Sequence, residues 1–103
     1  MEARQKFAEK KIPGGKLLKV KYELNPDTQT IQNISINGDY FLHPEDTITA
    51  IESALNGTAL AESKEAIAKT ITDELTKNNA SFIGVSSDDI AETIKEAAYP
   101  TTE

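Results

Sequence analysis

The hydrophobic spacing of this chain changes its period across residues 38–44, and this change restricts the possible folds more than any other feature. Before this segment apolar residues alternate with polar ones, and after it they recur every three or four positions. Alternation is typical of strands with one buried face, and the longer period is typical of amphipathic helices. The order predicts an α+β fold: a small antiparallel sheet, made of a hairpin and a short third strand, with three helices packed on one face.

The first half of the chain predicts the hairpin. Residues 16–24 alternate and place four apolar side chains on one side: Leu18, Val20, Tyr22 and Leu24. Residues 25–28, Asn-Pro-Asp-Thr, favour a type I turn because proline suits its second position. Residues 30–37 return as the second strand, where Ile31 is out of phase and indicates a bulge or the strand start. Residues 40–42 are long enough for the short third strand.

The second half predicts the helices. Residues 44–55 begin with a proline, which suits the first helical position, and carry apolar side chains on one face. Ser63 is expected to cap a second helix that ends at two asparagines. Residues 81–85 are expected to form a loop or short strand that buries its phenylalanine and isoleucine. A capping box at residues 86–89 predicts a third helix that runs to Ala98.

The net charge of −6 is unevenly distributed along the chain. Residues 1–21 hold seven basic and two acidic side chains, whereas residues 22–103 hold four basic and fifteen acidic side chains. Residues 1–10 have weak periodicity and predict a flexible basic arm, followed by a single domain over residues 11–99 and a tail at residues 100–103. Such an arm suits an acidic protein surface or a phosphate-bearing ligand, with a solvated tail as the alternative. Nucleic acid is disfavoured because the body is acidic and the arm has one aromatic residue.

Several function classes lack their required residues. The chain has no cysteine, which excludes a disulfide framework, a thiolate metal site and a cysteine nucleophile. One histidine and dispersed carboxylates supply no metal-ligand set. No apolar run approaches the roughly 18 residues of a membrane span, and no signal-peptide core is present, so a cytoplasmic location is expected.

The turn of Pro13, Gly14, Gly15 and Lys16 is one candidate site. Glycine amides followed by a lysine can hold a phosphate group. A phosphate-binding loop also needs a longer glycine-bracketed loop, a Ser or Thr after the lysine and a helix after the loop, and here a leucine and a strand follow. Two interpretations remain: a turn that opens a hairpin, or a turn that also presents Lys16 to a ligand or partner.

The segment at residues 38–44 is the other candidate site. His43 is the one side chain suited to acid–base chemistry at neutral pH, but its position favours a helix-start residue whose ring bonds a nearby backbone group. Asp39 follows a strand-ending glycine, which favours a side-chain bond to nearby N–H groups or an interface role over a general base. No catalytic set emerges, which favours an accessory or binding module.

Three segments resemble the C-terminal accessory domain of lipoate-protein ligases. They are residues 11–18 (Lys-Ile-Pro-Gly-Gly-Lys-Leu-Leu), residues 38–45 (Gly-Asp-Tyr-Phe-Leu-His-Pro-Glu) and residues 51–57 (Ile-Glu-Ser-Ala-Leu-Asn-Gly). The resemblance covers residues 11–98. It implies a non-catalytic accessory subunit that pairs with the catalytic subunit of a bipartite ligase and is required for ATP-dependent activation of lipoate to lipoyl-adenylate.

The resemblance also implies partners and site residues. ATP, Mg and lipoate are expected on the catalytic subunit, with no cofactor bound by this chain alone, and lipoyl acceptor domains are indirect partners. The residues expected near the partner or the adenylate are Pro13, Gly14, Gly15, Lys16, Gly38, Asp39, Tyr40, Phe41, His43 and Pro44.

Two alternatives remain open. A carrier domain would itself be lipoylated on Lys16, but such domains present the lysine at a hairpin tip within an all-β sandwich, whereas the second half here is helical. The other alternative is a regulatory or scaffold module with no role in lipoylation.

Overall fold

The computed structural model describes residues 4–13 and 16–98 of the chain. Its elements follow the order strands, helices, one short strand and a last helix: β1 (Arg4–Ile12), β2 (Lys16–Leu24), β3 (Ile31–Gly38), β4 (Phe41–His43), α1 (Thr47–Leu55), α2 (Lys64–Lys77), β5 (Ser81–Ile83) and α3 (Ser87–Ala98). The α+β class is confirmed.

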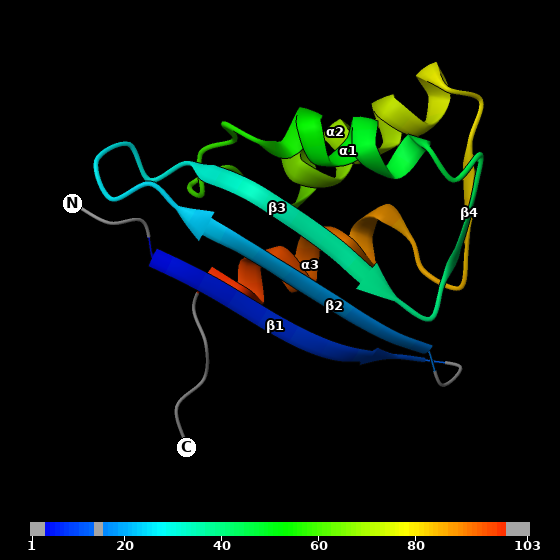
Figure 1. The fold of residues 1–103 in the computed structure, drawn as a ribbon, viewed down its shortest axis with the longest axis horizontal. Helices are drawn as coiled ribbons and strands as arrows, with labels where there is room; N and C mark the ends of the chain where they lie inside the picture. The colour runs from blue at the N-terminus through cyan, green and yellow to red at the C-terminus, as the bar shows by residue number, and fades with distance from the viewer. Residues whose placement is uncertain (1–3, 14–15, 99–103) are drawn as a thin grey trace.

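The main sheet is antiparallel, with β2 between β1 and β3 (Figure 1). Strand β2 has the predicted bounds, and its four alternating apolar side chains are all buried. Within the described residues, the helices cover one face of this sheet: α3 packs on β1 and β2, α1 packs on β3, and α2 packs on α1 and α3. The predicted helical layer on one face is confirmed.

Strand β1 corrects the prediction of a flexible arm over residues 1–10. Residues 4–12 pair with β2 along its whole length, from Arg4 opposite Leu24 to Ile12 opposite Lys16. The alternation was hard to detect because the helix-facing positions include Lys6, Ala8 and Lys10, which are not aliphatic. Residues 1–3 and the predicted tail at 100–103 lie outside the described residues.

Strand β3 contains the predicted bulge. Its register with β2 shifts between Lys21 and Glu23, and Asn33 has a positive φ of 53°. Ile31 is nevertheless fully buried. The preceding turn is wider than a type I turn, because the N–H of Gln29 donates to the carbonyl of Asn25 at 2.8 Å.

The outer edge of β3 is closed by a side chain of α1 and by that of Asn56, the residue that follows this helix. The N–H of Ile36 donates to a carboxylate oxygen of Glu52 at 3.0 Å, and the N–H of Ile34 donates to the amide oxygen of Asn56 at 3.3 Å. An exposed strand edge is a template for another strand, and these two side chains occupy it. Two residues of the segment 51–57 therefore hold helix and sheet together.

The predicted short third strand exists but does not join the main sheet. β4 pairs antiparallel with β5, so that Phe41 lies opposite Ile83 and Leu42 lies opposite Phe82. We call this pair of strands the β4–β5 ribbon; it lies at the end of the sheet where β3 ends (Figure 1). Phe82 is half-buried as predicted, whereas the predicted burial of Ile83 is wrong, because Ile83 alternates to the outer side of the ribbon.

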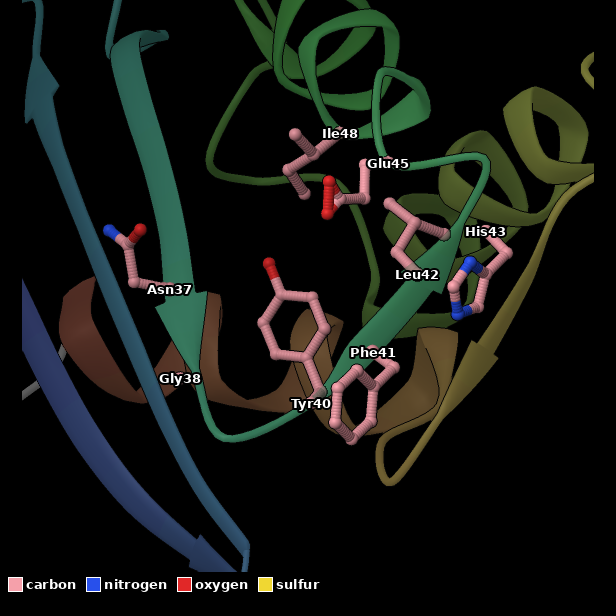
Figure 2. A pocket seen from close by; sticks show the side chains of 8 residues that line it. All are labelled: Asn37, Gly38, Tyr40, Phe41, Leu42, His43, Glu45 and Ile48. Atoms are coloured by element: carbon pink, nitrogen blue, oxygen red, sulfur yellow. The ribbon is translucent and has the colours of Figure 1, made fainter.

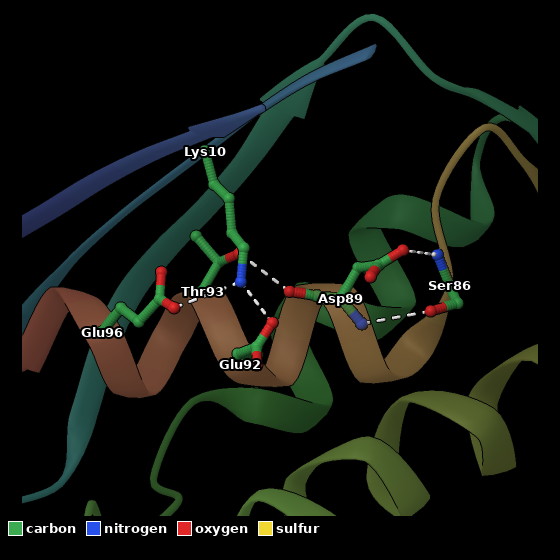
Figure 3. Close-up of polar contacts among 6 residues, drawn as sticks. All are labelled: Lys10, Ser86, Asp89, Glu92, Thr93 and Glu96. Carbon is green, nitrogen blue, oxygen red and sulfur yellow. Dashed lines mark hydrogen bonds and ion pairs between the residues drawn. The ribbon is translucent and has the colours of Figure 1, made fainter. Parts of the chain in front are cut away.

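Two of the three helix starts match the sequence. The Ser63 hydroxyl accepts a hydrogen bond from the N–H of Ala66 at 3.1 Å. Ser86 and Asp89 form the predicted reciprocal capping box at 3.0 and 3.1 Å (Figure 3). Helix α1 begins three residues later than predicted, because the carbonyls of residues 44–46 accept bonds from N–H groups three positions on, in a tighter turn than the α-helix.

The core between sheet and helices is aliphatic. Isoleucines from β3 and all three described helices are fully buried or nearly so, and the buried hydroxyl of Tyr22 donates to the carbonyl of Ile94 at 2.8 Å. Each such side chain contributes about 1.5 to 3 kcal/mol on burial. Among the described helices, none has the length and apolar character needed to cross a membrane.

Candidate docking site at one end of the sheet

The two sequence segments predicted to form the site meet in the structure. Leu18 pairs with Gly38 across β2 and β3, and the N–H of Asp39 donates to the carbonyl of Leu17 at 2.8 Å. Residues 16–18 and 38–43, which are far apart in the sequence, therefore lie at the same end of the sheet. Gly14 and Gly15 lie outside the described residues, so an anion site in that turn stays a prediction. Pro13, beside them, is exposed.

Gly38 is required at the junction for steric reasons. Its φ is 150°, and a Cβ placed on it would lie 2.2 Å from the carbonyl oxygen of Leu17. No real Cβ approaches a backbone oxygen so closely, and the backbone of β2 cannot move without breaking its pairing. A side chain at position 38 would therefore separate the two segments.

Gly84 makes room for the stem of Lys16. A Cβ on Gly84 would lie 3.5 Å from Cγ and 3.6 Å from Cε of Lys16, and 3.6 Å from Cα of Tyr40. Gly84 has a φ of 105°, which favours glycine. The aliphatic part of Lys16 thus lies beside the backbone that follows β5, and Lys16 is half-buried. Within the described residues its ammonium group makes no ion pair or hydrogen bond.

Tyr40 is fixed between β3, β5 and α1. Its hydroxyl donates to the carbonyl of Ile36 at 2.6 Å, and its ring meets that of Phe82 edge to face, with centroids 5.5 Å apart. Burial, and secondly the negative charge of Glu52, raise the pKa of Tyr40 to about 12. The phenol is therefore protonated at neutral pH and has a positioning role.

A shallow cavity of about 350 Å³ lies between the end of β3, β4 and the start of α1. Figure 2 shows the Tyr40 ring standing in it, with the hydroxyl end on the side of Glu45 and Ile48. The lining residues are Asn37, Gly38, Tyr40, Phe41, Leu42, His43, Glu45 and Ile48. Its floor is apolar and its rim carries exposed polar groups, which suits a contact with a protein surface.

His43, Pro44 and Asp39 do not have the local roles that the sequence predicted. His43 is the last residue of β4 and is exposed, and Pro44 precedes the helix by three residues, so neither starts α1. Among the described residues, no side-chain hydrogen bond of His43 or Asp39 is present. The backbone N–H of Asp39, and not its carboxylate, holds the corner. Both side chains are free to face a partner.

Sequence reasoning placed Phe41 in the site but missed Ile83, Gly84 and Glu52. Phe41 and Ile83 lie opposite each other on the outer side of the β4–β5 ribbon and are 60% and 57% exposed. Ile83 and Gly84 come from a segment about forty residues further along the chain than Phe41, and no local pattern indicates that they lie near Phe41 or Lys16. Glu52 was quoted only as part of a motif, yet it contacts β3 and influences Tyr40.

One lysine of the predicted arm is used inside the domain. Lys10 of β1 forms ion pairs with Glu92 and Glu96 of α3 (Figure 3). Burial lowers the pKa of Lys10, but its hydrogen bonds to Glu92 and Glu96 and their charges outweigh this effect and raise it. The hydrogen bond from Lys10, and then its charge, lower the pKa of Glu92. Lys10 therefore fastens β1 to α3 and is not available to a partner.

The described residues offer no set of three His, Cys, Asp or Glu side chains close enough to hold a metal ion. The predicted location of ATP, Mg and lipoate on another subunit stays a prediction. The site can present an apolar pair, a lysine and several carboxylates, which have no partner within the described residues, to a second protein surface.

Comparisons with known proteins identify the family of this chain. The family model described as bacterial lipoate protein ligase C-terminus matches residues 5–94. Among solved structures, the chain is similar to one in a structural analysis of an archaeal lipoylation system, a bipartite lipoate protein ligase and its E2 lipoyl domain from Thermoplasma acidophilum. That similarity has 27% identity and a TM-score of 0.64, and it covers 90% of this chain and 94% of the other. No curated protein matches the chain. The family match spans most of the sequence, and the chain therefore belongs to the family of lipoate protein ligase C-terminal domains.

Proposed function

We propose that this chain is the non-catalytic accessory subunit of a bipartite lipoate protein ligase. It would act with a cytoplasmic catalytic subunit, on which ATP, Mg and lipoate bind, and would be required for the activation of lipoate to lipoyl-adenylate. Lipoyl acceptor domains would then receive the lipoyl group from the catalytic subunit.

The observation that carries this proposal is the junction of the segments 11–18 and 38–45 at one end of the domain. Both segments belong to the sequence signature of the family, and the bond from Asp39 to Leu17 and the close approach at Gly38 bring them together. The same end presents the half-buried Lys16 and the exposed outer side of the β4–β5 ribbon. This arrangement favours a surface that completes a site on another chain.

Lys16 is the residue that we expect nearest to the adenylate. Its stem is held beside Gly84, and its ammonium group has no partner within the described residues. A lysine in this state can neutralise a phosphate or a carboxylate without first breaking an ion pair. The same stem contact argues against the carrier alternative, because an acylated lysine has to swing away from its own domain.

The test is the rate of lipoyl-adenylate formation by the catalytic subunit with and without this chain. We expect the chain to raise the rate; equal rates would contradict the proposal. Lys16→Ala should lower adenylation while leaving the free energy of unfolding nearly unchanged. Lys19→Ala is the matched control, because Lys19 is an exposed lysine on the helix-free face of the same strand.

The intact mass of this chain distinguishes a lipoylated carrier domain from the proposed accessory subunit. After incubation with the catalytic subunit, ATP and lipoate, the accessory chain should keep its mass, and the gain of one lipoyl group on Lys16 would support the carrier role instead.

A further inference from the structure

We infer that the outer side of the β4–β5 ribbon, centred on Phe41 and Ile83, is the surface that docks onto the catalytic ligase subunit, and that it meets an apolar patch bordered by Lys or Arg side chains. The inference rests on the proposed function, because it names the contact surface and the chemistry of that same partner.

Phe41 and Ile83 form an exposed apolar pair on the outer side of the ribbon. Phe41 and Ile83 are direct cross-strand neighbours, and both are more than half exposed. The inner side of the ribbon is anchored through Leu42 and Phe82, so the outer pair is presented on a fixed support. Exposed apolar side chains scattered singly are ordinary, but a contiguous pair on a rigid element is typical of the centre of a protein interface.

Acidic side chains flank this apolar pair. Asp39, Glu45 and Asp46 are exposed in the segments that flank β4, and none of them forms an ion pair within the described residues. Polar rims of interfaces carry charges opposite to those of the partner. The partner that fits is therefore apolar at its centre and basic at its border.

The same charges argue against a second copy of this chain. Two copies joined through Phe41 and Ile83 would bring the carboxylates of both flanking segments together, and like charges across an interface are repulsive. A nucleic acid is disfavoured for the same reason.

The outer side of the ribbon is continuous with Lys16. Gly84 follows Ile83 directly and lies beside the Lys16 stem. A surface that covers Ile83 is thus adjacent to Lys16, so that one docking event would bring the free ammonium group to the catalytic subunit. This links the contact surface to the expected effect on adenylation.

The experiment measures the dissociation constant of the complex between this chain and the catalytic ligase subunit of the same organism by calorimetry. The double variant Phe41→Ala, Ile83→Ala should weaken binding about 100-fold, the loss expected when two central contacts are removed. Phe7→Ala is the matched control and should change binding less than about 3-fold. Phe7 is 54% exposed, but it lies on β1, away from the ribbon.

A second variant removes the risk that truncation weakens the ribbon. Ile83→Thr keeps the β-branched shape that suits a strand and replaces the ethyl group on Cβ with a hydroxyl, so it should fold normally and still weaken binding about 10-fold. Unchanged binding by a folded Ile83→Thr and a folded double variant would overturn the inference.

Charge reversal tests the basic border of the partner. Asp39→Lys with Glu45→Lys should weaken binding about 10-fold at low salt, and the difference from wild type should shrink as salt screens it. Asp27→Lys is the control, because Asp27 is exposed in the turn between β2 and β3. Tighter binding by the charge-reversed variant would contradict the inference that the partner surface is bordered by basic side chains.

The outcomes separate the two proposals. If the wild-type chain binds and stimulates the catalytic subunit while the ribbon variants do so equally well, the docking surface is wrong and the proposed function stands. If the wild-type chain neither binds nor stimulates, both are wrong. Self-association that is lost in the double variant would assign the ribbon to a second copy and overturn the inference.

Discussion

The main sheet and the β4–β5 ribbon use the same alternation of side chains with opposite results. In β2 the alternating residues Leu18, Val20 and Tyr22 are buried because α3 covers them. In the ribbon the inner pair is covered, but the outer pair of Phe41 and Ile83 is not. A strand pattern thus specifies which side chains share a face, whereas the packing of other elements decides whether that face is core or contact surface.

The largest predicted effect tests this difference with one substitution in α3, which covers the main sheet, and one in the ribbon. Ile94→Ala should lower the free energy of unfolding by about 2 to 5 kcal/mol, because Ile94 is fully buried and its loss leaves a cavity. Ile83→Ala should lower it by less than about 1 kcal/mol, since that side chain is mostly exposed. Chemical denaturation of both variants is the measurement, and similar losses would contradict the assignment of Ile83 to the surface.

The next effect concerns the point where the two regions join. Gly38→Ala should lower the free energy of unfolding by about 3 kcal/mol, because the new Cβ meets the Leu17 carbonyl. The control is Gly57→Ala, where φ is 89° but no atom lies within 4 Å, so backbone strain alone should cost about 1 to 2 kcal/mol. Thermal and chemical unfolding compare the two, and an equal cost would mean that the contact at Gly38 can relax.

A smaller effect tests the support of the ribbon by pH. Because the folded pKa of Tyr40 is about 12 and its ordinary value is about 10, the stability that its neutral form contributes is present below pH 10 and is lost as the pH rises towards 12. The loss should not exceed about 1 kcal/mol, since the ring is partly solvated. Tyr40→Phe should be less stable than wild type at neutral pH, and this difference should shrink between pH 10 and 12. A constant difference across that range would mean that the hydroxyl is not held in its protonated form.

The smallest effect concerns the attachment of β1 to the helices. Because the pKa of Glu92 is lowered in the folded chain, the stability that its ion pair with Lys10 contributes is present above the ordinary pKa of a glutamate. This stability is lost as the pH falls through the lowered value. Because the pKa of Lys10 is raised, the stability that its charged form contributes is present at neutral pH and is lost in strong alkali. Lys10→Gln should therefore flatten the acid limb of the stability curve slightly. Lys69→Gln, which breaks a pair within α2, is the control and should not change the protection of β1 amides in hydrogen exchange.

The features that sequence could predict are those that neighbouring residues decide. The bounds of β2 follow from its own alternation, and the capping box of Ser86 and Asp89 is complete within four residues. Helix α2 likewise starts at its predicted Ser63 cap. The two motif segments were also identified as parts of one site, through a family resemblance.

The features that sequence could not predict depend on distant partners. β1 was missed because Lys10, at a helix-facing position, is made compatible with the interior by carboxylates of α3 more than eighty residues away. The exposure of Ile83 depends on the register of β5 against β4, which three residues cannot specify. The start of α1 was placed too early because proline suits both a helix start and the turn that precedes it.

In the role proposed above, this domain completes a lipoate ligase by docking through the β4–β5 ribbon. The most direct test is a titration of the catalytic subunit with this chain, in which the rate of lipoyl-adenylate formation is followed. The account predicts a saturable rise in rate whose midpoint moves to about 100-fold higher concentration for Phe41→Ala, Ile83→Ala and stays in place for Phe7→Ala. A rate that does not depend on the concentration of the wild-type chain would contradict it.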